Sequence, residues 1–246
     1  MAGGRRMKYI LLVAGKGSRL QPLTLKHPKS MFKLDENTNL VQRMVSLIKK
    51  SDKNAEIVAV TGHMHRCIEK SLDGVEFVYN PFYEVTNSIA SLWMVKEHLN
   101  SDNVVLIDGD IVMSGKLIEE VVCSPVTKAT VLLDSSIRTS GDYNVEISED
   151  KVLVMSKELK TYYGEYAGVT KLDRKSALLL KDEMEVMIEE GYYDQWYENA
   201  LVQMIFKNNF ELYYHDISSY EWTEVDEVND LILAKNIHLK EKGNNS

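Results

Sequence analysis

The chain has 246 residues, 44% of them hydrophobic, and a formal net charge of -8. Its size and apolar content are sufficient for one large core, while the acidic balance argues against nucleic acid or an anionic membrane as the main partner. No apolar run reaches the roughly 20 residues that span a bilayer, and the first residues lack the apolar stretch of a signal peptide. Two cysteines are too few for a disulfide framework, which fits a cytoplasmic protein.

The first half of the chain alternates between strand and helix patterns. Short apolar runs predict buried strands at 9–13, 56–60, 75–79 and 104–107, and amphipathic spacing predicts helices at 39–50, 63–72 and 87–99. Asn87 or Ser88 is placed to cap the last of these helices. Such alternation is typical of a parallel sheet with helices on both faces.

The second half follows a different pattern. A strand is predicted at 129–133, a hairpin from 143–147 and 152–155, a further strand at 163–172 and an edge strand at 211–215. Helices are predicted at 173–190, 195–207 and 226–239. The expected fold is therefore α/β with a mixed central sheet and helices on both faces. We expect one domain over residues 7–240, with flexible ends at 1–6 and 241–246.

A loop rich in glycine and basic residues follows the first strand. Gly15 and Gly17 let backbone N–H groups converge on one point, because no Cβ blocks tight turning or a close ligand. Lys16, Arg19 and Lys29 add positive charge around those groups. The glycine spacing fits neither a P-loop nor a dinucleotide fingerprint. The loop nevertheless predicts a cradle for a polyphosphate.

Two pairs of carboxylates, each pair two residues apart, are candidate metal ligands. Asp108 and Asp110 end the fourth strand, and residues two apart on a strand point to the same face. That edge is where open α/β sheets bind ligands, and two carboxylates facing a triphosphate favour Mg²⁺ between them. The alternative is a solvated Asp–Gly turn. Glu224 and Asp226 form the second pair, although Asp226 could instead cap the final helix.

The loop resembles the Gly-x-Gly-x-Arg-Leu-x-Pro-Leu-Thr and Pro-Lys signature of nucleotidyltransferases that activate sugar phosphates and phosphocholine. Nine positions match: Gly15, Gly17, Arg19, Leu20, Pro22, Leu23, Thr24, Pro28 and Lys29. The segment from Trp222 to Asp226 resembles the Trp-x-Glu-Ile-Asp segment of bacterial phosphocholine cytidylyltransferases. Residues 87–92 and 164–171 resemble segments of the choline and aminophosphonate branch. The resemblance covers nearly the whole chain, from about residue 7 to 238.

The resemblance implies a single Rossmann-like, glycosyltransferase-A-type domain that forms a nucleoside-diphosphate product and releases pyrophosphate. Carried onto this sequence, it implies catalytic roles for Arg19, Lys29 and Lys157, and Mg²⁺ ligation by Asp110 and Asp226 with Glu224. The implied nucleotide-binding residues are Val13, Ala14, Gly15, Lys16, Gly17, Ser18, Asn87, Ser88 and Asp108. CTP is implied by the branch alone, as is a product used to decorate cell-surface glycans or lipids.

Aromatic residues crowd the second half and suggest a site for a cationic acceptor. Aromatic faces attract ammonium groups, and carboxylates add countercharge, although ordinary packing would also explain many of these rings. The candidates are Tyr143, Glu165, Tyr166, Trp196, Tyr197 and Glu198. We expect an acceptor with an amine and a phosphate or phosphonate, such as phosphocholine or 2-aminoethylphosphonate.

Several alternatives stay open at this point. They are a sugar-1-phosphate uridylyl- or thymidylyltransferase, a glycosyltransferase of the same general fold, and a non-catalytic nucleotide-binding relative. A glycosyltransferase would not need the Gly-x-Gly-x-Arg-Leu loop, because its donor lacks the reactive triphosphate. The sequence leaves the oligomeric state undecided, a homodimer included.

Overall fold

A nine-stranded mixed sheet forms the centre of the protein in a computed structural model, which describes residues 6–138, 141 and 143–244. Four strands of the first half run parallel in the order β3 (Glu76–Tyr79), β2 (Glu56–Thr61), β1 (Met7–Val13) and β4 (Asn103–Asp108). The apolar residues of β2, β1 and β4 are mostly buried, as the sequence predicts for a sheet covered on both faces, whereas β3 at the edge is only partly covered. All four predicted strands of the first half are confirmed.

The second half extends the same sheet mainly with antiparallel strands. β9 (Gly164–Asp173) lies antiparallel between β4 and β6 (Thr130–Asp134). The predicted hairpin is confirmed as β7 (Asn144–Ser148) and β8 (Lys151–Ser156), and β7 also pairs with β9, so the sheet curls back at this end.

The predicted edge position of the strand at 211–215 is wrong. β10 (Tyr213–Asp216) lies inside the sheet order, parallel to β6 on one side and antiparallel to β8 on the other. The strand is short, and it meets β8 through a single residue pair, Tyr213 with Lys151. Its four residue pairs with β6 hold it inside the sheet.

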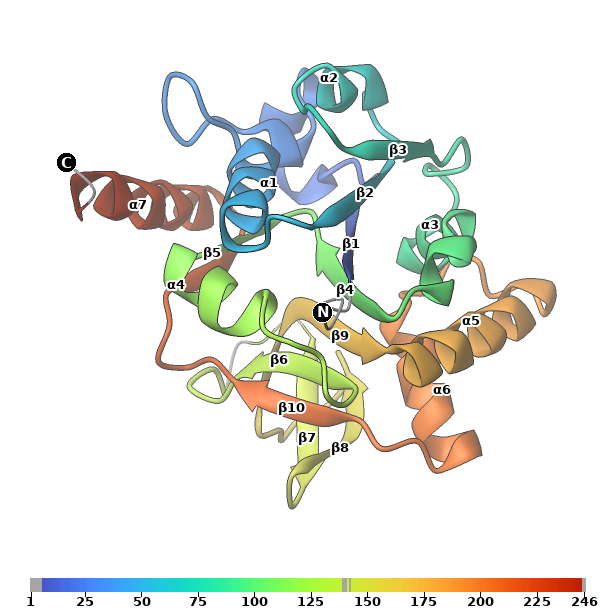
Figure 1. The fold of residues 1–246 in the computed structure, drawn as a ribbon. Helices are drawn as coiled ribbons and strands as arrows, with labels where there is room; N and C mark the ends of the chain where they lie inside the picture. The colour runs from blue at the N-terminus through green and yellow to red at the C-terminus, as the bar shows by residue number, and fades with distance from the viewer. Residues whose placement is uncertain (1–5, 139–140, 142, 245–246) are drawn as a thin grey trace, which may run out of the picture.

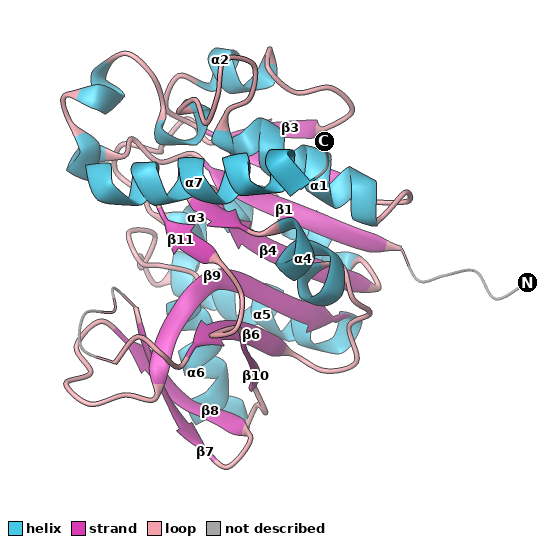
Figure 2. Ribbon diagram, turned by 90° about the vertical axis from the view of Figure 1, so that its left-hand side faces the viewer, coloured by secondary structure: helices cyan, strands magenta, loops and turns pink. Residues whose placement is uncertain are grey.

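Helices cover both faces of the sheet (Figure 1). One face packs α3 (Ser88–Met94), α5 (Arg174–Glu189) and α6 (Glu198–Asn208). The other packs α1 (Leu40–Ser51), α2 (His65–Glu69) and α4 (Gly115–Leu117), which continues as a π-helix at 118–122. α7 (Val228–Asn244) crosses the face that carries α1 (Figure 2).

The helix ends follow local capping chemistry. The Asn39 side-chain oxygen accepts a hydrogen bond from the Gln42 N–H, and the Asn39 N–H donates to Gln42 Oε1, which completes a capping box for α1. Asn87 caps α3 as expected. Three boundaries differ from expectation: α2 is only five residues long, the region 87–99 divides into α3 and a 3₁₀ segment at 96–100, and α7 runs past 239 to Asn244.

A small two-stranded sheet, which the sequence did not predict, lies beside the main one. β5 (Ile111–Met113) pairs antiparallel with β11 (Trp222–Glu224), with Ile111 opposite Glu224. The Val225 N–H donates to the Asp110 carbonyl oxygen at 3.0 Å. This pairing brings the two predicted acidic segments together.

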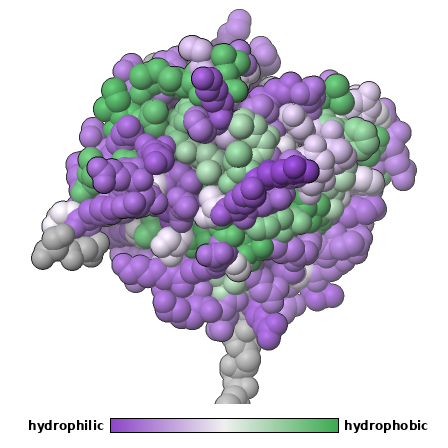
Figure 3. Space-filling model, turned by 90° about the horizontal axis from the view of Figure 1, so that it is seen from above, coloured by the Kyte–Doolittle hydropathy of each residue, from purple (hydrophilic) through white to green (hydrophobic). Residues whose placement is uncertain are grey.

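The surface mixes hydrophilic and hydrophobic residues. Figure 3, a view from above Figure 1, shows hydrophobic areas lying among hydrophilic residues. Within the described ranges 6–138, 141 and 143–244, no helix combines the length and apolar character needed to cross a bilayer.

Candidate active site

The carboxyl ends of β1 and β4 open onto a cleft of about 400 Å³. Most of the predicted nucleotide-binding residues line it: Val13, Ala14, Gly15, Gly17, Ser18, Asn87, Ser88 and Asp108. Lys16 is not among the lining residues, and its ammonium group instead pairs with the Glu84 carboxylate at 3.0 Å. The structure therefore brings the loop after β1 and the start of α3 to the same cavity, as expected for parallel strands.

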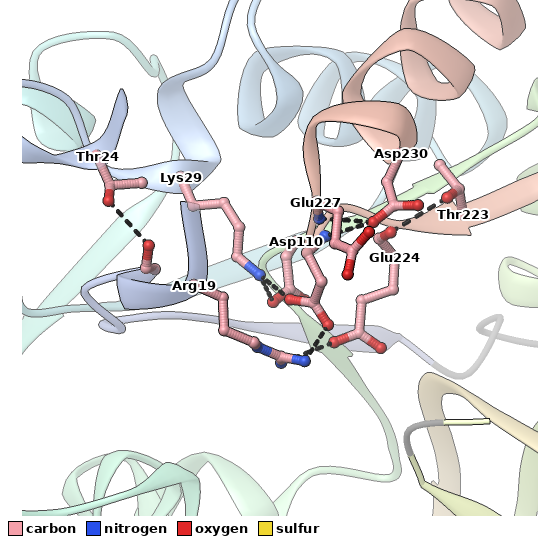
Figure 4. Close-up of polar contacts among 10 residues, drawn as sticks. Arg19, Thr24, Lys29, Asp110, Thr223, Glu224, Glu227 and Asp230 are labelled. Atoms are coloured by element: carbon pink, nitrogen blue, oxygen red, sulfur yellow. Dashed lines mark hydrogen bonds and ion pairs between the residues drawn. The ribbon is translucent and has the colours of Figure 1, made fainter. Parts of the chain in front are cut away.

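Gly17 holds the loop in the shape that faces this cleft. Its φ of +62° lies in the left-handed region that favours glycine. A Cβ on Gly17 would come within 2.9 Å of the Lys29 Cβ, closer than side chains tolerate. The Thr24 hydroxyl donates to the Gly17 carbonyl oxygen at 2.8 Å (Figure 4). This bond links the glycine turn to the Pro-Leu-Thr part of the signature.

Three carboxylates meet two cations on one side of the cleft. Asp110, Glu224 and Asp226 each place an oxygen within 4.8 Å of the others. Lys29 Nζ donates to Asp226 Oδ1 at 2.6 Å and lies 2.8 Å from Asp110 Oδ2. An Arg19 guanidinium nitrogen lies 2.6 Å from Asp226 Oδ2 and another lies 3.8 Å from Glu224. Figure 4 shows Arg19 and Lys29 reaching from the loop toward Asp110 and Glu224.

The carboxylate of Asp226 is therefore engaged by Lys29 and Arg19 rather than used as a helix cap. The backbone N–H groups of Asp226 and Glu227 donate to Asp230, at 3.0 and 2.7 Å, and this fixes the turn before α7. Asp108 lines the cleft but is not part of the carboxylate triad. The chain turns at Gly109, whose N–H donates to the Leu12 carbonyl oxygen at 3.0 Å, so Asp110 leaves the line of β4.

Burial and like charge dominate the electrostatics of this cluster. Burial, together with Asp110 and Asp226, raises the pKa of Glu224 to about 10. Burial works against the charge of Lys29, but Asp110 and Asp226 outweigh it and raise the pKa of that amine. Burial and the charges of Glu198 and Asp110 raise the pKa of Asp108. Three oxygen donors that repel one another are the donor set that a hard divalent cation such as Mg²⁺ prefers.

The opposite side of the cleft carries four of the six predicted acceptor residues. Tyr143, Tyr166, Trp196 and Glu198 line it together with Lys157. Lys157 Nζ lies 4.5 Å from the centre of the Trp196 ring, within cation–π range. Burial raises the pKa of Glu198 to about 7, partly offset by its own backbone N–H and Lys157, while Asp110 adds to the rise.

Tyr197 and Glu165 lie away from the cleft wall. Tyr197 is fully buried at the start of α6, and its hydroxyl bonds that of Tyr166 at 2.5 Å, so it supports a lining residue from behind. Glu165 is buried on β9 and is not among the lining residues. Trp196 and Tyr197 are adjacent aromatic residues that point in different directions. The sequence alone could not tell which of the two faces the cleft.

The structure adds lining residues that the sequence reasoning missed. Tyr83, Thr86 and Ser91 surround the start of α3, where their position next to Asn87 was the available signal. Gly168 also lines the cleft, with a φ of +68°, and a Cβ there would lie 2.6 Å from Ile111. Its place in the Gly-Glu-Tyr-x-Gly segment was the clue.

Comparisons with known proteins identify the family to which this chain belongs. The nucleotidyl transferase family model matches residues 8–133, and the chain belongs to this family of enzymes. The choline-phosphate cytidylyltransferase of Streptococcus pneumoniae is 24% identical over 91% of this chain and 95% of its own. The CMP-5'-(3-aminopropyl)phosphonate synthase of Streptomyces rubellomurinus is also 24% identical, over 91% of this chain and 37% of its own.

Solved structures confirm the predicted fold class. The CTP:phosphocholine cytidylyltransferase of Streptococcus pneumoniae superposes with a TM-score of 0.76 at 23% identity, covering 95% of this chain and 99% of its own. A Bacillus anthracis structure described as a glucose-1-phosphate thymidylyltransferase gives 0.74 at 21% identity, covering 94% of each chain. At these identities the likeness establishes the fold and leaves the substrates to the site.

Proposed function

We propose that the protein is a Mg²⁺-dependent cytidylyltransferase that transfers CMP from CTP to a small phosphorylated or phosphonate acceptor bearing an amine, and releases pyrophosphate. One observation carries this proposal. Arg19 and Lys29, from the loop after β1, contact the carboxylate triad of Asp110, Glu224 and Asp226. The relatives whose names specify cytidylyl transfer support the choice of CTP.

The chemistry requires positioning and charge neutralisation rather than a strong base. The acceptor is already an anion, so it can attack the α-phosphorus in line without losing a proton. Loop N–H groups and Arg19 would hold the triphosphate, Lys29 would lie between the reacting phosphates, and Lys157 would face the acceptor phosphate. Mg²⁺ held by the carboxylate triad would neutralise phosphate oxygens.

A sugar-1-phosphate uridylyltransferase is the second candidate. The Haloferax volcanii UTP–glucose-1-phosphate uridylyltransferase is 31% identical, but over only 45% of this chain. The acceptor side instead presents Glu198, Trp196 and Lys157, a mixture of charge and aromatic surface suited to a zwitterion. The single domain over 7–240 and the use of the product in cell-surface decoration stay predictions.

Pyrophosphate release tests the proposal directly. CTP, UTP, ATP, GTP and dTTP would each be combined with phosphocholine, 2-aminoethylphosphonate and a set of sugar 1-phosphates, with Mg²⁺ or with EDTA. We expect release with CTP and an amine-bearing acceptor, abolished by EDTA. Release with UTP or dTTP and a sugar phosphate would replace this proposal with the second candidate.

A further inference from the structure

Glu198 has a buried carboxylate oxygen that lacks a partner. The side chain lines the cleft, yet the residue is only 5% exposed, and Oε2 has no hydrogen-bond partner among the described residues. A buried polar atom without a partner carries the full cost of its lost hydration, and native proteins rarely leave one without a reason. Its position at the first turn of α6 favours negative charge but leaves this oxygen unbonded.

The surroundings of Glu198 indicate that the missing partner is a cation. Asp110 lines the same cleft and its negative charge acts on Glu198, a repulsion that a neutral group would not relieve. Lys157 is close enough for its charge to act on Glu198. A positive and a negative side chain at one end of the cleft match a small zwitterion, with its phosphate toward Lys157 and its cation toward Glu198.

The aromatic residues beside Glu198 do not form an open cage. Tyr143 and Tyr166 are 9% and 4% exposed and pack edge to face, with ring centres 6.2 Å apart. Tyr143 meets Trp196 in the same way at 6.3 Å, and the Trp196 ring already has Lys157 Nζ at 4.5 Å. Quaternary ammonium groups are recognised by several free ring faces. The rings here are largely used by one another and by Lys157.

A hydrogen-bond donor fits the site better than a methylated cation. A trimethylammonium group has no N–H bond, whereas a primary or secondary ammonium can donate to a carboxylate in a short, charge-assisted bond. Because Glu198 lines the cleft, a donor of this kind bound there would offset the hydration that its buried carboxylate has lost.

We propose that Glu198 binds the ammonium group of an acceptor that carries N–H bonds, such as a primary aminoalkyl phosphate or phosphonate, and that this bond selects against trimethylammonium acceptors. The inference rests on the proposed function and assigns the acceptor class of the same cleft.

The test compares three phosphonate acceptors that differ only in the group at the far end: a primary ammonium, a trimethylammonium or a hydroxyl. With CTP and Mg²⁺, kcat/KM is measured by pyrophosphate release for 2-aminoethylphosphonate, its N,N,N-trimethyl derivative and 2-hydroxyethylphosphonate. We expect the primary amine to exceed both others by roughly 100-fold, because a site built to bond an N–H group rejects analogues that lack it. Equal or better use of the trimethyl compound by the wild type would overturn the proposal.

Glu198→Gln keeps the shape of the side chain and removes its charge, and it should reduce the preference for the amine over the hydroxyl compound to about threefold or less. Glu183→Gln is the matched control, because Glu183 is also buried, at 7% exposed, but accepts a hydrogen bond from Lys207 and does not line the cleft. An unaltered preference in Glu198→Gln would refute the assignment. The wild-type comparison needs no variant and so decides even if Glu198→Gln is unstable.

Calorimetry of acceptor binding to the CTP-free protein separates this inference from the proposed function. Binding of 2-aminoethylphosphonate that weakens in Glu198→Gln, without turnover, would support the ammonium site and reject the cytidylyltransferase. Absence of both binding and turnover would reject both.

Discussion

Lys29→Ala is the most direct perturbation of the reaction site. Lys29 is 12% exposed and pairs with Asp226 at 2.6 Å and Asp110 at 2.8 Å, so its removal leaves carboxylates facing one another without this cation. Breaking a buried pair in this way costs about 3–5 kcal/mol. Arg19 still contacts Asp226 in the variant, so we expect a loss of about 3 kcal/mol in unfolding free energy.

The effect on catalysis should be larger than the effect on folding. Removing one preorganised donor to developing charge lowers kcat by about 10²- to 10³-fold, so pyrophosphate release should fall by at least that factor. Urea unfolding with and without Mg²⁺ gives the stability, and we expect Mg²⁺ to recover part of the loss. Lys26→Ala is the control, because Lys26 is an exposed lysine of the same loop that does not line the cleft. Turnover within threefold of wild type in Lys29→Ala would refute the assigned role.

Three further predictions test the loop and the core. Gly17→Ala should raise KM for CTP about tenfold, because alanine at a φ of +62° costs about 1–2 kcal/mol, whereas Gly191→Ala, at +91° with open space, should leave KM as it is. Arg19→Lys should weaken triphosphate binding in a calorimetric titration, because lysine lacks the planar fork that grips two oxygens; unchanged affinity would contradict this. Burial lowers the pKa of Lys171 from 10.5 to about 8. Since the unfolded chain binds more protons between these values, this group should add about 3 kcal/mol to stability as pH rises from 8 to 10.5, and Lys171→Met should abolish that slope in unfolding curves.

The structural reason for the Lys171 effect is local. Its ammonium donates to the Val121 and Ser124 carbonyl oxygens and to the Ser124 hydroxyl. These acceptors lie at the end of the π-helical segment and just after it. No carboxylate contacts it within the described residues, so hydrogen bonds alone must offset the lost hydration.

The sequence by itself determined the elements that depend on neighbouring residues. The strands of the first half, the cap at Asn87 and the glycine loop after β1 all follow from spacing over a few positions. The same holds for the signature from Gly15 to Lys29, whose Arg19 and Lys29 line the cleft, although Lys16 and Lys26 do not. Local patterns suffice here because each element encodes its own backbone preference and its own buried face.

Tertiary structure decided the arrangements that join distant segments. Lys29 meets Asp226 across 197 residues only because β5 pairs with β11, two strands too short to leave a clear pattern. The inner position of β10 and the burial of Tyr197 next to the exposed Trp196 likewise depend on which surfaces pack together. Glu198 looks like an ordinary first-turn acid in the sequence; its burial and its unpaired Oε2 appear only once α6 is packed against α5 and β8. Such features arise from the packing of whole elements, whose energies no short stretch of sequence contains.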